Sequence, residues 1–365
     1  MVESSRKGEM RRMIKCMGCM KDYPAQKREC PYCGYAGKIE NLSPAYQRPG
    51  TILSERYIIG KAFHQDSIGI SYMGWDRLLE KKVVIKEYFP DSIAFRIDGK
   101  EIVSEPKLEK LYESGKEAFL REIENWSQIE EVNGIARVYD HMTQYGTVYY
   151  VREFVKGKTI REVLEQENPI LIGQAKRWTQ QLIQVLFQLQ QIGVAHGNLS
   201  IDSIVVTEEE IKLINFGVRV NDNKARGILF EGNPYIPKEV YEDTQLFWQK
   251  ADVYATAAIF YRMATGQTVN FLDRKIRKEK IKSPFELGIW MQPEIEKGLM
   301  GILNGDPKKK EINLTRLKQI FWAANQEVRS GNKKKEEQKS YFLLILIGVE
   351  GIIAILLAII LILMW

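Results

Sequence analysis

Cysteine is scarce in this sequence, and its placement is uneven. The 365 residues include four cysteines, all of them between Cys16 and Cys33. Cysteines spread along the chain would suggest the disulfides of a secreted protein, whereas a tight cluster points to a metal site. The N-terminal region also lacks an apolar stretch, so we expect no export signal there.

A strong charge imbalance is also absent. The chain carries 53 lysines and arginines against 47 aspartates and glutamates. It has no basic stripe interleaved with aromatic residues, so nucleic acid is not an expected partner. Hydrophobic residues make up 45% and charged residues 27% of the chain, which are the proportions of a folded globular protein. The length favours two or three domains.

The cysteines form two C-x-x-C pairs, Cys16/Cys19 and Cys30/Cys33, separated by ten residues. Two such turns can place four thiolates around Zn²⁺, with Zn–S distances of about 2.3 Å. The segment is too short to bury a core, so a structural zinc ion would supply most of its folding energy. A redox pair would need a βα unit, which the segment lacks, and two disulfides would need an oxidising compartment. We predict a zinc ribbon over residues 13–37, followed by a linker over residues 38–52.

A second set of absences lies in the segment GVAHGNLSIDS, residues 193–203. It resembles the catalytic loop H-R-D-x-x-x-x-N of protein kinases, and the histidine and the loop length agree. Three other positions do not agree, because Gly197, Asn198 and Ser203 stand where the family has arginine, the catalytic aspartate and the metal-binding asparagine. Twelve residues further on, Asn215 begins N-F-G where the family has D-F-G.

These replacements remove the groups that the family uses for phosphoryl transfer. In an active kinase the loop aspartate deprotonates the substrate hydroxyl, and the D-F-G aspartate holds Mg²⁺. Asn198 is neutral and cannot accept that proton, while Asn215 offers a hard cation only an uncharged amide oxygen. Ser203 is shorter than asparagine and would reach a metal only through water. We therefore predict no catalytic residue at these positions, weak or absent ATP binding, and no role for Mg²⁺.

The segment VVIKEYFP, residues 83–90, carries the most specific part of the resemblance. It resembles the third strand of bacterial Ser/Thr kinases, which implies that Lys86 is the lysine that holds the nucleotide phosphates. The partner implied for Lys86 is Glu122 on a helix expected over residues 114–129, with Glu124 as the second choice. Such a pair could serve residual nucleotide binding or only position the helix.

The glycine-rich loop of the family is degraded in this chain. His64 and Asp66 stand at two of its three glycine positions, and only Gly69 remains, which adds Gly69 to the residual nucleotide-binding set. The carboxylate of Asp66 would oppose ATP phosphates. Arg152 falls at the back of the implied adenine pocket, on an alternating strand expected over residues 147–155. This arginine should need a buried partner, fill the pocket, or turn to solvent through a register slip.

The second half of the chain keeps motifs that serve the fold of the family. Residues 237–239 resemble the A-P-E motif and residues 252–254 the D-V-Y motif, and Lys310 is the implied partner of Glu239. No serine or threonine lies between residues 216 and 239, so phosphorylation there could act only at Tyr235. A misalignment of this half is the alternative. We expect an α+β, two-lobed protein kinase-like fold over residues 53–326.

Residues 341–365 form a 25-residue apolar run with one charge, Glu350. This length spans a hydrocarbon core of about 30 Å. The basic segment 327–340 precedes the run, which predicts a single-pass membrane helix with the remaining domains in the cytoplasm. A stripe of small residues predicts that the helix forms a homodimer or pairs with another helix. The alternatives are a buried helix of a soluble protein and a plain anchor.

Together these features predict a membrane-anchored pseudokinase that acts as a signalling scaffold or regulator. Its partner would be another protein, such as an active kinase or a membrane complex. The alternatives are an atypical active kinase, in which Asp202 or another carboxylate replaces the missing groups, and a nucleotide sensor without turnover.

Overall fold

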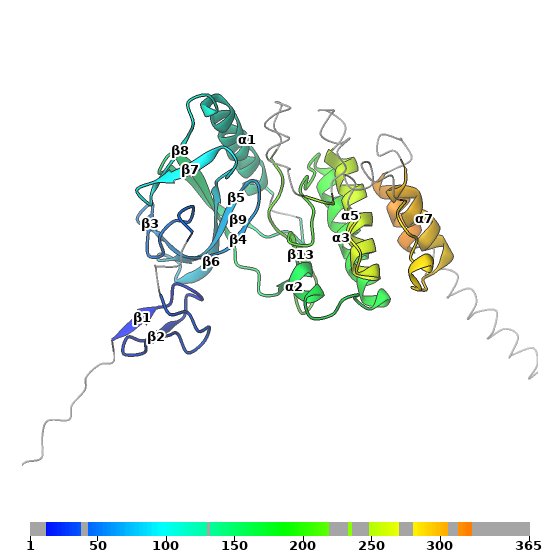
Figure 1. The fold of residues 1–365 in the computed structure, drawn as a ribbon, viewed down its shortest axis with the longest axis horizontal. Coiled ribbons are helices and arrows are strands. Elements are labelled where there is room, and N and C mark those ends of the chain that lie inside the picture. The colour runs from blue at the N-terminus through cyan, green and yellow to red at the C-terminus, as the bar shows by residue number, and fades with distance from the viewer. Residues whose placement is uncertain are drawn as a thin grey trace, which may run out of the picture.

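The structure is a computed structural model in which the chain divides into a sheet-rich lobe, a helix-rich lobe and a small N-terminal hairpin (Figure 1). The hairpin pairs β1 (Met13–Lys15) with β2 (Asp22–Pro24). The residues described are 12–37, 43–129, 132–218, 233–235, 248–269, 280–305 and 313–322.

The first lobe is built on a six-stranded antiparallel sheet in the order β3-β4-β5-β6-β10-β9. Contrary to the expected alternation, β10 is buried on both faces, because α1 covers the side of the sheet that an isolated sheet would expose to water. The strands are β3 (Ile52–Leu53), β4 (Tyr57–Gln65), β5 (Gly69–Asp76), β6 (Lys81–Tyr88), β9 (Val138–Gln144) and β10 (Thr147–Glu153).

Helix α1 (Glu109–Ser127) packs against β8, β9 and β10. It confirms the helix expected over residues 114–129 and begins five residues earlier. The buried residues of α1 recur at intervals of three or four, as expected for an amphipathic helix that packs on a sheet. Before it lies a short hairpin of β7 (Ala94–Ile97) and β8 (Glu101–Ser104). The buried residues of α1 are Tyr112, Gly115, Ala118, Phe119, Glu122, Ile123 and Trp126.

A fully buried charge pair joins this hairpin to the sheet. Arg96 Nη2 lies 2.6 Å from Glu87 Oε2, and neither side chain is exposed. The hydroxyls of Tyr72 and Tyr149 donate to the same carboxylate at 2.7 and 2.5 Å, which satisfies the remaining acceptor capacity of Glu87. Residues 43–50, expected as linker, pack on this network, because one of their backbone N–H groups donates to the Tyr72 hydroxyl at 2.9 Å.

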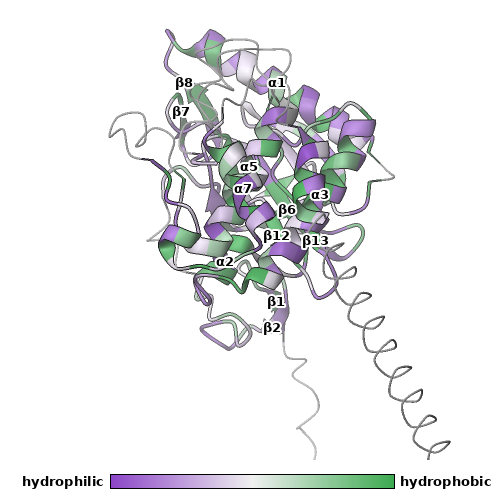
Figure 2. Ribbon diagram, turned by 90° about the vertical axis from the view of Figure 1, so that its right-hand side faces the viewer, coloured by the Kyte–Doolittle hydropathy of each residue, from purple (hydrophilic) through white to green (hydrophobic). Residues whose placement is uncertain are grey.

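The second lobe is mainly helical. It includes a three-stranded sheet, β11-β12-β13, in which β12 and β13 form a hairpin after the catalytic-loop segment. Helix α3 packs against α5, and in Figure 2 it carries both hydrophobic and hydrophilic segments, as an amphipathic helix should. The elements are β11 (Lys158–Thr159), α2 (Ile160–Leu164), α3 (Ile172–Gln191), β12 (Ile204–Val206), β13 (Ile211–Leu213), α5 (Trp248–Thr265), the 3₁₀ turn Phe285–Leu287 and α7 (Pro293–Leu303).

Several predictions concern residues outside the described ranges. Among the residues that the structure describes, no helix has the length and apolarity to cross a membrane. The apolar run 341–365, the basic segment 327–340 and the A-P-E-like residues 237–239 lie outside those ranges, as does Lys310.

Candidate functional site

Two of the three degenerate positions of the catalytic-loop segment, Asn198 and Ser203, have side chains held by hydrogen bonds within the protein. The Asn198 amide donates to the backbone carbonyl of Asn215 at 3.5 Å and accepts from Asn233 Nδ2 at 2.9 Å. The buried Ser203 hydroxyl donates to the carbonyl of Ser200 at 3.0 Å and accepts from its N–H at 2.8 Å. These side chains stabilise the loop itself, which leaves them poorly placed to receive a proton or a metal ion.

The histidine of the loop has a structural position. His196 is buried, with Nε2 donating to the carbonyl of Ile214 at 3.0 Å and Nδ1 accepting from the N–H of Asn198 at 3.3 Å. Burial lowers the pKa of His196 to about 4. The Asp252 carboxylate accepts from the N–H groups of His196 and Gly197 at 2.7 and 2.9 Å. The D-V-Y aspartate therefore fixes the backbone of the loop.

Asn215 and Phe216 follow β13 at the junction of the lobes. Asn215 has a φ of 57°, a left-handed conformation that asparagine tolerates better than most residues. The Phe216 ring stacks on Trp126 of α1, with centroids 4.6 Å apart and planes 6° apart. Its other neighbour is Tyr150 of β10, at 5.4 Å and 23°. We call Trp126, Phe216 and Tyr150 the aromatic sandwich, and it joins the two lobes.

Asp66 provides the partner of the kinase-type lysine. Lys86 Nζ lies 2.7 Å from Asp66 Oδ2, and the N–H groups of Ile68 and Gly69 donate to Asp66 Oδ1 at 3.0 and 2.9 Å. Burial lowers the pKa of Lys86 and the Asp66 charge opposes that effect. For Asp66, burial alone would raise the pKa, but Lys86 and His64 bring it well below its ordinary range. We call Asp66 with these three donors the Asp66 clasp.

The predicted pair of Lys86 with Glu122 is wrong. The ion pair of Lys86 is with Asp66, and its other electrostatic neighbour is Arg152. Glu122 is buried on α1, while Glu124, the second choice, is exposed. The physical reason is proximity, because the β4–β5 turn folds over β6 and brings Asp66 to the lysine.

Gly69 has a packing role that the sequence did not suggest. A Cβ at this position would lie 1.8 Å from the carbonyl oxygen of Glu87 on the neighbouring strand. Only glycine fits that approach of β5 to β6, whatever occupies the loop. This contact explains why one glycine remains in a loop that has lost the other two.

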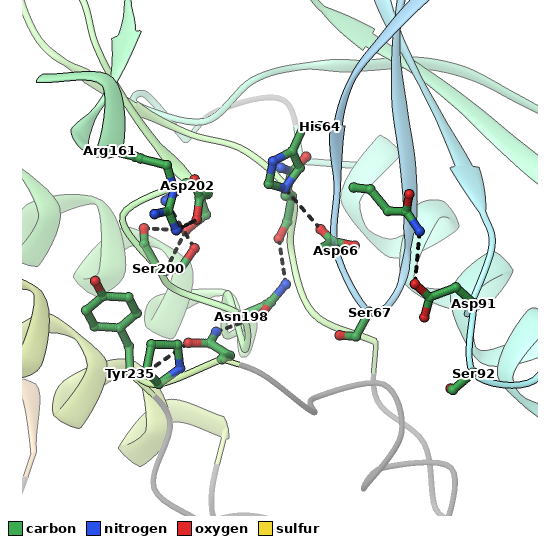
Figure 3. A pocket seen from close by; sticks show the side chains of 15 residues that line it. His64, Asp66, Ser67, Asp91, Ser92, Arg161, Asn198, Ser200, Asp202 and Tyr235 are labelled. Carbon is green, nitrogen blue, oxygen red and sulfur yellow. Dashed lines mark hydrogen bonds and ion pairs between the residues drawn. The ribbon is translucent and has the colours of Figure 1, made fainter. Parts of the chain in front are cut away.

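The degenerate positions Asn198, Ser203 and Asn215 meet at one cavity of about 790 Å³ between the lobes. The predicted nucleotide-binding residues Lys86, Glu122 and Gly69 are not among the residues that line it. In Figure 3, His64 and Asp66 reach it from the sheet-rich lobe, and Arg161 and Asp202 face them from the other lobe. Arg161 Nε and Nη2 bind the two oxygens of Asp202 at 2.5 and 2.6 Å. The predicted positions that line the cavity are Asp66, Asn198, Asp202, Ser203 and Asn215.

A second cavity of about 550 Å³ continues under the sheet, where the resemblance implies an adenine pocket. Arg152 lines it and is only 4% exposed, so the predicted turn to solvent is wrong. A bulge between Val151 and Arg152 sets this orientation. Arg152 Nη1 donates to the carbonyl of Glu153 at 3.0 Å. Burial lowers the pKa of Arg152.

Sequence comparison matches residues 94–313 to the family described as "Protein kinase domain", which is more than half of the chain. The chain belongs to the protein kinase domain family. The match begins after Asp66 and Lys86, so the arrangement of the glycine-loop region is known here from the fold alone.

Relatives within the family include plant and bacterial proteins. The chain is 25% identical over 285 residues to CBL-interacting protein kinase 14 of Oryza sativa subsp. japonica, covering 75% of this chain and 60% of that protein. It is 24% identical over 230 residues to a probable serine/threonine-protein kinase of Clostridium acetobutylicum, covering 60% of this chain and 31% of that protein. The chain thus spans less than two thirds of the length of these relatives.

Two solved structures share the fold of this chain. The structure titled "PpkA-294 apo form" superposes with a TM-score of 0.63 at 21% identity, covering 76% of this chain and 99% of that chain. The structure of Rad53 residues 1–466 with AMP-PNP gives a TM-score of 0.54 at 14% identity, covering 72% of this chain and 63% of that one.

The four cysteines lie together outside the kinase fold. Their sulfur atoms are all within 4.8 Å of one another, and all four thiols are free. Cys16 Sγ lies 3.6 Å from Cys33 Sγ, and Cys19 Sγ lies 3.7 Å from Cys30 Sγ. A tetrahedral ZnS₄ centre with Zn–S of about 2.3 Å requires sulfur–sulfur distances of about 3.8 Å. The cluster therefore fits zinc, while a disulfide would need about 2.05 Å.

The cysteine hairpin docks on the sheet-rich lobe. The carbonyl of Met17, inside the first C-x-x-C pair, accepts the N–H of Lys61 on β4 at 2.6 Å. Gly60 permits this approach, because a Cβ there would lie 2.4 Å from the same carbonyl oxygen. Lys15 Nζ lies 3.6 Å from the centre of the Trp75 ring on β5. The hairpin is thus attached to the two strands that lead to Asp66.

Three contacts of the site were missed in the sequence: the Asp66 clasp, the Arg161–Asp202 pair and the aromatic sandwich. The Asp66 clasp could have been predicted, because Asp66 replaces a glycine in the loop that lies next to Lys86. The other two join residues 41 and 90 positions apart, and spacing alone carries no signal for such pairs.

Proposed function

We propose that this protein is a catalytically silent member of the protein kinase family that works as a signalling scaffold or regulator. Its activity would lie in binding another protein rather than in phosphoryl transfer. The partner would be an active kinase or a membrane complex. The relatives are named as kinases, so the proposal rests on the residues of this chain.

The observation that carries the proposal is the Asp66 clasp. Backbone N–H groups of the glycine loop and the β6 lysine are the donors that cradle nucleotide phosphates in active kinases. Here the Asp66 carboxylate occupies the N–H groups of Ile68 and Gly69 together with Lys86. A phosphate would have to displace an anion that belongs to the protein. The loss of the two metal-binding positions, Ser203 and Asn215, acts in the same direction, and ATP binding should be weak and independent of Mg²⁺.

The rival function is an atypical kinase that uses Asp202 as its base. Both oxygens of Asp202 accept from Arg161, so a substrate hydroxyl would have to compete with the guanidinium to reach this carboxylate. A nucleotide sensor without turnover would require ATP to open the Asp66 clasp. The Asp66 clasp supports a catalytically silent domain directly. Among the described residues, no contact in the cleft supports the atypical kinase or the nucleotide sensor in the same way.

The experiment is an assay with labelled ATP on the full chain, with Lys86→Met as the control variant. We expect no transfer to the protein itself or to generic substrates above the level of the control. Turnover that Lys86→Met abolishes would refute the proposal and favour the atypical kinase. A thermal shift with ATP but without turnover would favour the sensor.

The remaining parts of the proposal concern the segments on either side of the kinase fold. Residues 13–37 would form a zinc ribbon that holds one structural Zn²⁺. Residues 341–365 would form a single membrane-spanning helix, and the other domains would lie in the cytoplasm. Two copies of this helix could pair, which would make the protein a homodimer. A scaffold tied to a membrane raises the local concentration of its partner at that surface.

A further inference from the structure

Two buried polar atoms at the cleft between the lobes have no hydrogen-bond partner in the part of the chain that the structure describes. They are Arg152 Nε and Asn215 Oδ1. Their side chains are 4% and 6% exposed, and both line the cavity of about 550 Å³. An unsatisfied donor and acceptor are costly in a folded protein. Two of them on one cavity of ligand size suggest that a ligand completes both.

The charge around this cavity favours an anion. Arg152 lies close enough to Lys86 to lower the pKa of that lysine. Asp66 forms an ion pair with Lys86, whereas the anionic neighbour of Arg152 is Glu153, which forms its own ion pair with Lys212. Glu162 and Glu165 also line the cavity, but both are exposed to water, which screens their charge. Asp202 and Arg161 line the cavity too and form an ion pair with each other. Within the described ranges, Arg152 is thus a buried cation on this cavity that forms no ion pair of its own.

The shape of the 550 Å³ cavity and the other groups that line it limit the chemical class of the ligand. The phosphate end of the cleft is filled by the Asp66 clasp, which disfavours a phosphorylated ligand. The carbonyl of Glu153 already accepts from Arg152, so a donor on a purine base would have to share this oxygen with the arginine. The walls are mostly apolar and suit a flat ring. They are formed by Phe63, Met73, Val84, Val205 and Ile214.

We propose that the 550 Å³ cavity binds a flat, non-phosphorylated aromatic carboxylate, with the carboxylate on the Arg152 guanidinium and a donor group directed at Asn215 Oδ1. An Arg–carboxylate contact is short, directional and strong in a site closed to water. The ligand adds a hydrogen-bonded bridge between β10 and the residue before Phe216, so its binding stabilises the closed arrangement of the lobes. This site rests on the proposed function in one respect, because it requires that ATP does not occupy the cleft.

The first test is the stability of the ligand-free protein, measured as Tm on the full chain in mild detergent. A buried cation that serves to bind a ligand destabilises the folded protein when the ligand is absent. Arg152→Met should therefore raise the Tm of the ligand-free protein by a few degrees. The matched control is Arg121→Met, which removes one exposed arginine from α1 and should leave the Tm within about one degree. A fall in Tm for Arg152→Met would mean that the arginine is structural and would overturn the proposal.

The second test measures binding of two probes that differ in one charge, 4-hydroxybenzoate and 4-hydroxybenzamide, by titration calorimetry or ligand-detected NMR. The carboxylate should bind at least about tenfold more tightly than the amide. Arg152→Met should remove that preference, and Arg121→Met should keep it. If Arg152→Met fails to fold, Arg152→Gln provides the same comparison, because it keeps a donor and loses the charge.

The outcomes separate this site from the proposed function. Equal binding of the two probes, a preference that survives loss of Arg152, or no binding of either probe overturns the site and leaves the silent-kinase proposal standing. Displacement of the carboxylate by ATP in a Mg²⁺-dependent manner, with phosphoryl transfer, overturns both. Binding of 4-hydroxybenzoate that depends on Arg152, with no turnover of ATP, supports both.

Discussion

Replacing Asp66 by asparagine tests the Asp66 clasp most directly. Asp66→Asn keeps the size of the side chain and an oxygen for the N–H groups of Ile68 and Gly69, but it removes the charge opposite Lys86. The exposed fractions of the paired side chains are 2% for Lys86 and 22% for Asp66. Leaving a buried charge without its partner costs about 3–5 kcal/mol, and the partial exposure of Asp66 places this case near 3 kcal/mol.

Two limits bracket that magnitude. Two unit charges 2.7 Å apart attract by about 6 kcal/mol at an effective dielectric constant of 20, before the cost of removing them from water is subtracted. Lys86 can also escape by losing its proton, which costs about 5 kcal/mol at pH 7 for an amine with an ordinary pKa near 10.4. The loss of stability in Asp66→Asn therefore cannot exceed about 5 kcal/mol.

The assay is a double-mutant cycle with Lys86→Met, measured by urea unfolding and followed by the fluorescence of Trp75 and Trp126 in the sheet-rich lobe. Asp66→Asn/Lys86→Met should be more stable than Asp66→Asn alone, with a coupling energy of about 2–3 kcal/mol. Asp91→Asn is the control, because Asp91 lines the same cavity and bonds to Gln65 instead.

The same variants have a second readout in ATP binding. Asp66→Asn opens the donors of the glycine loop and should bind ATP at least about tenfold more tightly than the unmodified protein, whereas Asp91→Asn should not. The reasoning is refuted if Lys86→Met costs the same with and without Asp66, within about 0.5 kcal/mol. It is also refuted if Asp66→Asn leaves ATP binding unchanged.

Three further changes have defined outcomes. The chain should hold one zinc ion, and chelation or Cys30→Ser should release the cysteine hairpin and shift the fluorescence of Trp75, whereas elemental analysis without zinc would contradict the ribbon. His196 stays neutral in the folded protein at a pKa of about 4, while the unfolded chain takes up a proton below about 6.5. Stability should therefore fall by up to about 3 kcal/mol from pH 6.5 to 4, and a pH series of urea unfolding should show a flatter curve for His196→Gln. Phe216→Ala should cost about 3–5 kcal/mol in the same unfolding assay, and a cost under about 1 kcal/mol would mean that the aromatic sandwich is loosely packed.

Much of the frame was predictable, because it depends on patterns within short stretches. The β6 lysine strand and the helix expected over residues 114–129 are examples, and both are present in the structure. Cys16, Cys19, Cys30 and Cys33 were predictable as a cluster for the same reason.

The contacts between elements were predictable only in part. Glu122 was predicted as the partner of Lys86 from the family resemblance. The actual partner depends on how far the β4–β5 turn folds over the sheet, and the spacing of residues in the sequence does not predict that distance. The orientation of Arg152 depends on a bulge between β9 and β10, which no residue type marks. The docking of the cysteine hairpin on Gly60 needed the three-dimensional approach of two backbones.

The aromatic sandwich bears on how such a protein can change over evolutionary time. Phe216, Trp126 and Tyr150 come from three segments of both lobes, so loss of one ring would alter the shape that a partner meets. Polar exchanges at Asn198 would alter only a local hydrogen bond. If the protein is catalytically silent, as proposed, selection should relax at the positions where the family has its reactive residues and persist at the rings. A library of variants selected for partner binding should then accept many residues at position 198 and few at position 216.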